Sequence, residues 1–154
     1  MSANPEIGHP LIRRLGLPDL DRIYEIEKIA YPFPWTRGII KDCLSIGYAC
    51  FGLQIGKDLT GYTIFSWAAS EAHLLNLCIH PDWQQRGFGS LLLEYAISQM
   101  ARLENETIFL EVRASNPEAA ALYKKRGFKV VGYRRSYYQA GDSREDAIVM
   151  RLTL

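Results

Sequence analysis

Apolar and polar residues alternate along the chain in two patterns, which predict helices and strands. Four segments show the spacing of an amphipathic helix or are bounded by helix-capping residues: 17–31, 36–45, 88–103 and 116–127. Seven shorter runs have the composition of strands: 10–16, 48–55, 61–69, 72–80, 107–112, 128–138 and 145–152. In chain order this is β–α–α–β–β–β–α–β–α–β–β, a mixed α/β sheet of about seven strands with four helices on its two faces.

The connections between these elements refine the topology. Segment "GKDLTG" predicts a hairpin turn between the second and third strands. The run at 72–80 is almost continuously apolar, which favours a central place in the sheet. The strand–helix–strand unit from 73 to 112 should form a right-handed parallel crossover. The last two strands should close the sheet as an antiparallel pair.

Residues with special backbone preferences mark the ends of the helices. Pro32 and Pro34 cannot continue the first helix, so it should stop before them. Thr36 is placed to cap the second helix at its N-terminus, and Asn116 to cap the fourth. Gly127 suits the C-terminal cap of the fourth helix.

Length and composition indicate one globular domain, residues 1–154, with a loose leader at 1–9. Apolar residues make up 48% of the chain, enough for a core, and charged residues 23%. The net charge of +1 gives no general attraction to nucleic acid or membrane. Only "YRRSYY" near the C-terminus is a candidate for a local basic patch.

The three cysteines, Cys43, Cys50 and Cys78, are odd in number and form no CxxC motif. This pattern argues against a disulfide framework and a zinc site, and suits a reducing compartment. The start of the chain lacks the apolar region of a signal peptide, and no run is long enough to span a bilayer. We therefore expect a cytoplasmic protein without a bound metal, a monomer or weak oligomer.

The segment "QQRGFG", residues 84–89, follows a buried strand and opens a helix. Gly87 and Gly89 let successive N–H groups turn toward one point, the helix N-terminus adds partial positive charge, and Arg86 adds a formal charge. These features favour a site for an anion such as a pyrophosphate. The loop is neither a P-loop nor a GxGxxG fingerprint. The alternative is a tight turn whose glycines only relieve crowding.

Two longer strings favour the anion site over the tight turn, because they resemble motifs of a known family. "LCIHPDWQQRGFGSLLL" resembles motif A of the GCN5-related N-acetyltransferases (GNAT family), and "NPEAAALYKKRGFK" resembles their motif B. The resemblance implies the GNAT fold and acetyl-CoA as co-substrate. It also implies a set of cofactor-binding residues: Leu77, Cys78, Ile79, Gln84, Gln85, Arg86, Gly87, Phe88, Gly89, Ser90 and Asn116.

A closer resemblance covers residues 31–150. "FPWT", "LEVRASN", "GFKVVGYRRSYY" and "REDAIVM" are similar to a bacterial subfamily that acetylates the N-terminal alanine of ribosomal protein S18. This implies the S18 N-terminus as partner, and Trp35, Tyr137 and Tyr138 as walls of a slot for it. Alternatively, these aromatic residues only pack loops against the core. His80 departs from the subfamily, which often has an acidic residue there, with little effect expected on the chemistry.

The resemblance assigns Glu111 as the general base and Tyr123 as the general acid. Burial of Glu111 in an apolar strand should raise its pKa toward a useful value, unless it lies on a solvated face or pairs with Arg113. Tyr123 could donate a proton to the CoA thiolate, or could be a core aromatic residue. Asn116 can cap its helix and still donate to the pantetheine arm through its amide.

In the family, the backbone of residues 77–79 pairs with the pantetheine, and one N–H polarises the acetyl carbonyl. Cys78 is expected to be a buried apolar residue rather than a nucleophile, because nothing near it in sequence would make it a thiolate. His9, His73 and His80 show no metal spacing and are expected only at the surface or in turns.

Two rival functions remain open from the sequence. A small-molecule amine acetyltransferase could use the same scaffold, although the strings "LEVRASN" and "REDA" argue against it. A non-enzymatic acyl-CoA sensor would tolerate the loss of Glu111 and Tyr123.

Overall fold

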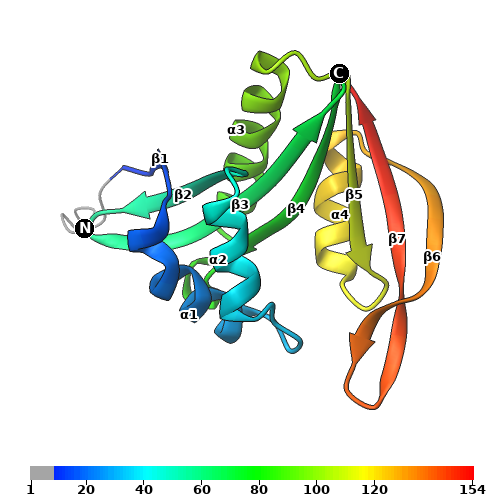
Figure 1. Cartoon of the computed structure of the whole chain (residues 1–154), viewed down its shortest axis with the longest axis horizontal. Coiled ribbons are helices and arrows are strands. Elements are labelled where there is room, and N and C mark those ends of the chain that lie inside the picture. The colour runs from blue at the N-terminus through cyan, green and yellow to red at the C-terminus, as the bar shows by residue number, and fades with distance from the viewer. Residues whose placement is uncertain (1–8) are drawn as a thin grey trace. The chain divides into compact units, whose positions relative to one another are not determined.

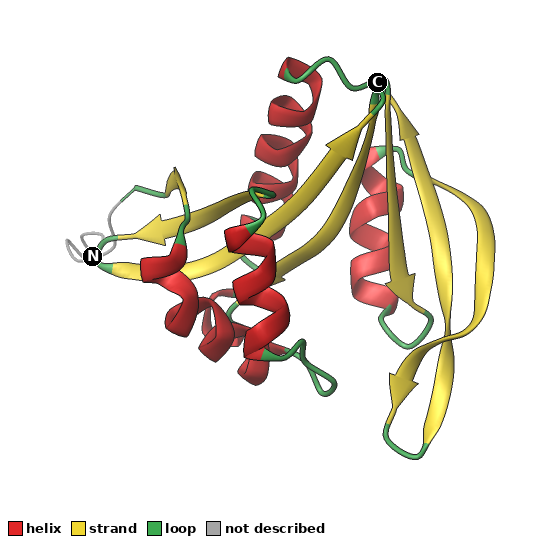
Figure 2. Ribbon diagram, in the orientation of Figure 1, coloured by secondary structure: helices red, strands yellow, loops and turns green. Residues whose placement is uncertain are grey.

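A computed structural model describes residues 9–154 and contains seven strands and four α-helices (Figures 1 and 2). The strands are β1 (Leu11–Arg14), β2 (Ala49–Ile55), β3 (Asp58–Ala68), β4 (Glu71–Ile79), β5 (Thr107–Arg113), β6 (Lys129–Ala140) and β7 (Ser143–Thr153). The helices are α1 (Leu20–Ala30), α2 (Arg37–Ser45), α3 (Phe88–Arg102) and α4 (Pro117–Arg126), with short 3₁₀ turns η1 (Leu17–Asp19) and η2 (Pro81–Trp83). The expected loose leader at 1–9 lies outside the described residues, except for His9.

The strands form one mixed sheet in the order β1-β2-β3-β4-β5-β7-β6. The predicted element order and the central place of β4 are therefore confirmed. β4 and β5 pair in parallel and β6 and β7 antiparallel, as predicted. The turn "GKDLTG" is shorter than predicted, because β3 begins at Asp58 and only Gly56 and Lys57 connect the strands. Leu59 and Thr60 are buried, and the Thr60 hydroxyl donates to the Leu53 carbonyl, so both belong to the sheet.

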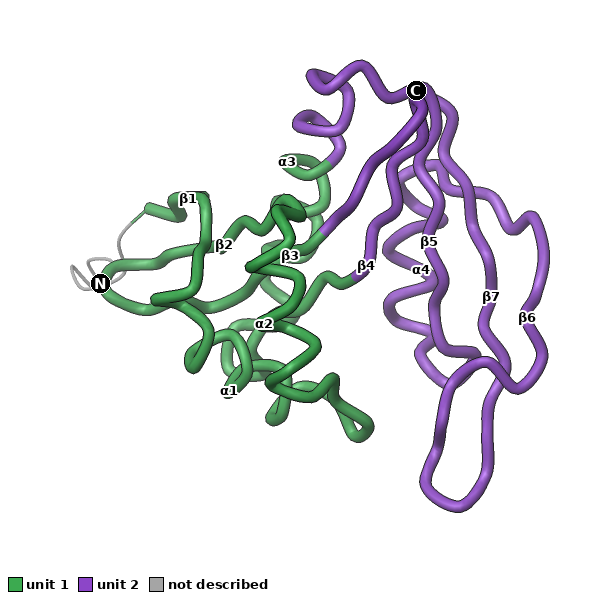
Figure 3. The backbone as a smooth tube through the Cα atoms, in the orientation of Figure 1, with its two compact units in different colours: residues 1–64, 76–96 green, residues 65–75, 97–154 purple. Residues whose placement is uncertain are grey.

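The chain packs as two compact units (Figure 3). Unit 1 contains the described residues up to Ile64 together with Asn76–Ala96, and unit 2 contains Phe65–Leu75 together with Ile97–Leu154. β3, β4 and α3 each contribute residues to both units.

The predicted helix ends are confirmed by the cap geometry. The Thr36 hydroxyl accepts a hydrogen bond from the Ile39 N–H, and the Asn116 side chain accepts one from the Ala119 N–H. Gly127 ends α4 with φ +111°, a left-handed conformation that glycine adopts without strain. Local sequence thus sets these boundaries.

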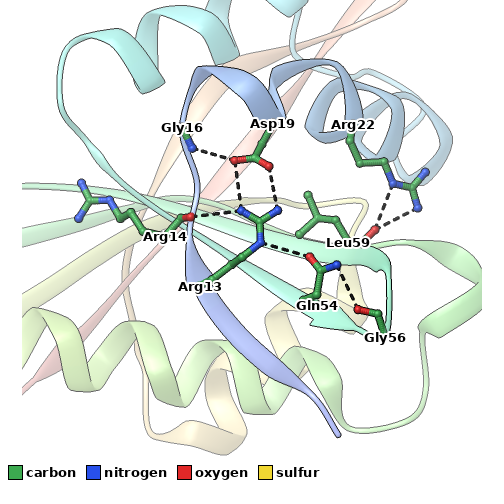
Figure 4. Close-up of polar contacts among 8 residues, drawn as sticks. All are labelled: Arg13, Arg14, Gly16, Asp19, Arg22, Gln54, Gly56 and Leu59. Carbon is green, nitrogen blue, oxygen red and sulfur yellow. Dashed lines mark hydrogen bonds and ion pairs between the residues drawn. The ribbon is translucent and has the colours of Figure 1, made fainter. Parts of the chain in front are cut away.

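Two arginines fasten the first elements of unit 1 to its sheet (Figure 4). The Arg13 guanidinium contacts both oxygens of Asp19, at 2.8 and 3.3 Å, and its Nε donates to Gln54 on β2. This pairing holds the pKa of Asp19 below its usual range. Arg22 on α1 donates two hydrogen bonds to the Leu59 carbonyl. The start of α1 is therefore tied to both β2 and β3.

Each unit has its own buried apolar side chains. In unit 1 the fully buried members include Ile23, Ile26, Ile40, Leu53, Tyr62 and Ile64; in unit 2 they include Met100, Ile108 and Leu110. The three cysteines are free and buried, as the sequence indicated. Among the described residues, none of the helices has both the length and the apolar character needed to cross a membrane.

Candidate active site

The C-terminal end of β4, in unit 1, carries the three residues expected to pair with pantetheine. The Leu77 carbonyl accepts a hydrogen bond from the Tyr31 hydroxyl at 2.6 Å, and the Ile79 carbonyl accepts one from the Gln84 side chain at 2.8 Å. Tyr31 follows α1, and Gln84 belongs to the loop after β4. Side chains from two other segments thus hold the backbone of the strand end.

Residues 84–87 connect η2 to α3. Gly87 has φ +83°, and Gln85 also has a positive φ of 60°. A Cβ added at Gly87 would meet no atom within 4 Å, so the glycine is not there to relieve crowding. Its left-handed backbone and the open space beside it explain the glycine instead. Relief of crowding therefore does not explain Gly87, whereas the backbone conformation of the turn does.

The start of α3 provides the donors that an anion requires. The first helical hydrogen bond runs from the Leu91 N–H to the Gly87 carbonyl, at 3.1 Å. The N–H groups of Phe88, Gly89 and Ser90 precede it and have no acceptor within the helix. The Arg86 guanidinium lies over the Trp83 ring, 5.1 Å from its centroid, which adds a positive charge beside this turn. The arrangement suits a phosphate group.

Cys78 is buried at 2% exposure, and burial, followed by the nearby Glu27 carboxylate, raises the pKa of its thiol. A thiol that stays protonated is a poor nucleophile. The interpretation of Cys78 as a buried apolar residue is confirmed.

Glu27 is a buried carboxylate that the sequence reasoning missed. Although only 2% exposed, it accepts hydrogen bonds from the Tyr62 hydroxyl, from the Asn76 amide at 2.9 Å and from the Trp35 N–H at 2.8 Å. It thereby joins α1, β3 and β4 to the segment that carries Trp35. The position of Glu27 on the apolar face of the first predicted helix was the signal that could have revealed it.

In unit 2, Glu111 lies on β5 with 9% of its side chain exposed. Its Oε2 lies 2.5 Å from His73 Nε2 on β4, and its Oε1 lies 3.3 Å from Arg134 Nε on β6. Arg113 instead pairs with Glu145 at 2.7 Å. Neither alternative considered for Glu111, a solvated strand face or a pair with Arg113, is therefore observed.

The environment of Glu111 lowers its pKa, so the expected raised value is wrong. The hydrogen bond from His73 is the largest cause, and the nearby Arg134 charge adds to it, together outweighing the opposite effect of burial. The expectation that His73 has only a surface or turn role is also wrong. The predicted parallel pairing of β4 with β5 contained the signal, because His73 lies opposite Phe109, two residues from Glu111.

Tyr123 and Asn116 lie on and before α4, also in unit 2. The Tyr123 ring is 7% exposed and packs edge-on against Phe128, with centroids 5.7 Å apart. Asn116 Oδ1 accepts from the Ala119 N–H at 3.2 Å, which leaves the amide N–H₂ group available as a donor. Both residues thus have structural contacts, and their expected chemical roles stay predictions.

Tyr137 and Tyr138 lie on β6 with their rings in edge contact, 4.9 Å between centroids. The Arg134 guanidinium lies over Tyr137, and that of Arg113 lies over Tyr138 at 4.4 Å. Burial and then the Glu111 charge raise the pKa of Tyr138. Unit 2 thus places Tyr138 within the electrostatic influence of Glu111, and Tyr137 lies against Tyr138.

His80 accepts a hydrogen bond from the Asp82 N–H through Nδ1 and forms the N-cap of η2, a turn position as expected. Across residues 9–154, no three His, Cys, Asp or Glu side chains gather in a way that could hold a metal ion.

Comparison with known proteins places these features in context. A model of the Acetyltransferase (GNAT) family matches residues 20–128. The chain is 38% identical over 143 residues to the [ribosomal protein bS18]-alanine N-acetyltransferase of Escherichia coli K12, covering 93% of this chain and 97% of that protein. It is also 38% identical over 141 residues to the enzyme of the same name from Haemophilus influenzae, covering 91% and 96%.

Solved structures agree with this similarity. The crystal structure of the E. coli ribosomal-protein-S18-alanine N-acetyltransferase superposes with a TM-score of 0.88 at 37% identity, over 94% of each chain. Arabidopsis thaliana NAA60 in complex with a bisubstrate analogue superposes with a TM-score of 0.86, over 94% of this chain and 98% of that one. At 15% identity, the second comparison shows a shared fold alone.

Proposed function

The chain belongs to the GNAT acetyltransferase family, and from this premise we propose that it transfers acetyl from acetyl-CoA to the N-terminal alanine of ribosomal protein S18. The observation that carries the proposal is the similarity to S18-alanine N-acetyltransferases along nearly the whole chain. We infer that it acts as a single domain in the cytoplasm, where S18 is made.

Acetyl-CoA is proposed to bind through the residues named from motif A. The N–H groups at the start of α3 and the left-handed Gly87 suit the pyrophosphate, because a backbone without a side chain admits a close anion. The backbone of Leu77, Cys78 and Ile79 would pair with the pantetheine, and the Asn116 amide would donate to the same arm. One N–H of this strand would polarise the acetyl carbonyl.

Glu111 is proposed to accept the proton that the attacking amine loses, through a water molecule. Its lowered pKa keeps the carboxylate ionised at neutral pH, so it can attract an α-ammonium group, but the same shift makes it a weaker base than an ordinary glutamate. The free amine attacks the acetyl carbon, and the bond from that carbon to the CoA sulfur breaks. Tyr123 would donate its phenolic proton to the departing thiolate. The acetyl group passes directly, without an acyl-enzyme on Cys78.

The peptide N-terminus is proposed to lie against Trp35, Tyr137 and Tyr138. Tyr138 interacts with the Glu111 charge within unit 2 and Tyr137 packs against Tyr138, which supports a place beside the base. Trp35 is held through its backbone by Glu27 within unit 1.

The test is a mass-spectrometric assay of acetyl transfer from acetyl-CoA to a synthetic S18 N-terminal peptide, beside a panel of polyamines, amino acids and aminoglycosides. We expect the peptide to have a much higher kcat/KM than any free amine. Faster turnover of a free amine would favour the small-molecule alternative. Binding of acetyl-CoA without transfer to any amine would favour an acyl-CoA sensor.

A further inference from the structure

The β6–β7 hairpin contains an irregularity next to Glu111. Arg134 pairs with Ala147 and Tyr138 pairs with Glu145, so three residues of β6, 135–137, lie opposite the single residue Asp146 of β7. A bulge of this kind bends a strand and redirects its side chains, and bulges are frequent beside active sites. The hairpin continues beyond the end of β5 (Figure 1).

Two charged residues of β7 hold the bulge through its backbone. Asp146 Oδ1 accepts a hydrogen bond from the Ser136 N–H at 2.9 Å. Arg144 donates to the Ser136 carbonyl at 2.7 Å and to the Tyr137 carbonyl at 3.0 Å. Ser136 itself has φ +50°, a conformation that costs free energy in a residue other than glycine. The three bonds offset that cost.

The bulge changes which side chains share a face. In a regular strand, consecutive residues point to opposite faces, and so do residues three apart. Here the rings of Tyr137 and Tyr138 touch, and Arg134 lies over Tyr137 at 5.5 Å while its Nε contacts Glu111. In a regular strand, Tyr137 would lie on the face opposite Arg134 and Tyr138, so the bulge is what brings the three side chains together.

A second contact anchors the same segment to β5. Arg113 donates to Glu145 at 2.7 Å and to the Gln139 carbonyl at 3.1 Å, while its guanidinium lies over the Tyr138 ring. Glu145 also accepts from the Ser115 N–H at 3.1 Å. Arg144 and Asp146 therefore contact the segment 134–139 directly, whereas Glu145 holds Arg113, which in turn contacts Gln139.

We propose that Arg144 and Asp146 are positioning residues that set the bulge and thereby place Tyr137 and Tyr138 for the incoming peptide N-terminus. The inference rests on the proposed function, which it deepens. Both side chains are exposed, so neither is needed to fill a core. Their bonds to main-chain atoms of Ser136 and Tyr137 are what the bulge requires.

The experiment compares Asp146→Ala, which removes the acceptor, with Asp146→Asn, which retains an oxygen at the same place. Glu106→Ala is the control, because it removes one exposed negative charge just before β5. Peptide kinetics are measured at saturating acetyl-CoA, and acetyl-CoA affinity by calorimetry. We expect Asp146→Ala to raise the peptide KM about tenfold, the loss expected for one hydrogen bond to a charged group.

The Asn variant and the control should keep a peptide KM within about threefold of wild type, because an amide oxygen also accepts the Ser136 N–H. The acetyl-CoA Kd should be unchanged in all three. An unchanged peptide KM in Asp146→Ala, or equal losses in the Ala and Asn variants, would overturn the proposal. An equal loss of acetyl-CoA affinity would indicate general disruption instead and would also overturn it.

A second measurement distinguishes failure of the proposed role of Asp146 from failure of the proposed enzymatic function. If the wild-type protein does not acetylate the S18 peptide, the proposed function fails. Amide hydrogen exchange at Ser136 then tests the bulge itself. Exchange should be about tenfold faster in Asp146→Ala than in wild type or Asp146→Asn, in line with the loss of one hydrogen bond. Equal exchange in all of them would show that Asp146 does not hold the bulge.

Discussion

Gly61 of β3 offers the sharpest test of how the sheet supports the end of β4, where acetyl-CoA is proposed to bind. A Cβ at this position would lie 2.5 Å from Ile79 Cδ1 and 2.8 Å from the backbone carbonyl oxygen of Cys78. A side-chain tip can move aside, but a backbone oxygen moves only with its strand. Gly61→Ala should therefore displace β4 at the residues proposed to bind pantetheine.

The magnitude follows from two opposing effects. Inserting a methyl group into a packed interior costs about 1–3 kcal/mol. Replacing glycine restricts the unfolded chain, which raises the free energy of unfolding by about 0.4–1 kcal/mol. The net loss of unfolding free energy should be about 1–2 kcal/mol, or roughly 2–8 °C in Tm for a chain of this size. Disturbing one hydrogen bond to the cofactor should weaken acetyl-CoA binding about threefold to tenfold.

Gly52 of β2 is the matched control, because its added Cβ would meet only side-chain atoms, those of Leu15 and Leu59. Gly52→Ala can cost stability but should leave the acetyl-CoA Kd unchanged. Thermal denaturation followed by circular dichroism and calorimetric titration with acetyl-CoA measure the two quantities. The reasoning is refuted if Gly61→Ala binds acetyl-CoA as tightly as wild type, or if both variants lose the same affinity.

Four other changes test the site and its support. Glu111→Gln should lower kcat by about 10²–10⁴-fold at unchanged acetyl-CoA affinity, and an equal kcat would exclude Glu111 as base. His73→Phe removes the largest cause of the low Glu111 pKa, so that pKa should rise and the acidic limb of the kcat/KM profile should move to higher pH; a superimposable profile would contradict this. Gly87→Val should weaken acetyl-CoA binding about tenfold, because a left-handed backbone costs other residues about 1–2 kcal/mol; calorimetry is the check. Asp19 has a lowered folded pKa, so its stabilising contribution is present above its unfolded pKa of about 3.9 and is lost as pH falls further. Denaturant titrations of Asp19→Asn should show a smaller loss of stability on acidification than wild type.

The features predictable from the sequence are those set by short stretches of chain. Thr36, Asn116 and Gly127 fix helix ends through bonds within four residues, so their roles could be predicted without a fold. The order of helices and strands along the chain, and the central place of β4, followed from their spacing and apolar content. The start of β3 was predicted at Gly61, three residues after the observed start at Asp58, because "DLT" contains turn-forming residues. In the structure, Leu59 and Thr60 are buried and belong to the strand.

The electrostatics of Glu111 could not be predicted in the same way. Burial alone raises a carboxyl pKa, and that was the only effect that the apolar run around Glu111 indicated. The decisive partners, His73 and Arg134, lie 38 and 23 residues away along the chain and meet it only through strand pairing. The bulge depends likewise on the register between β6 and β7, which the residue pattern does not set.

The three buried thiols can report the opening of unit 1 without an added probe. Cys43, Cys50 and Cys78 are the only cysteines in the sequence, and all lie in unit 1. Burial raises the pKa of each thiol, so an alkylating reagent meets little thiolate until that part of the chain opens. The rate of alkylation therefore counts openings of unit 1 without any introduced label. A ligand that binds to β4 and the following loop and stabilises unit 1 would slow the alkylation of these cysteines, and the slower rate would reveal its binding.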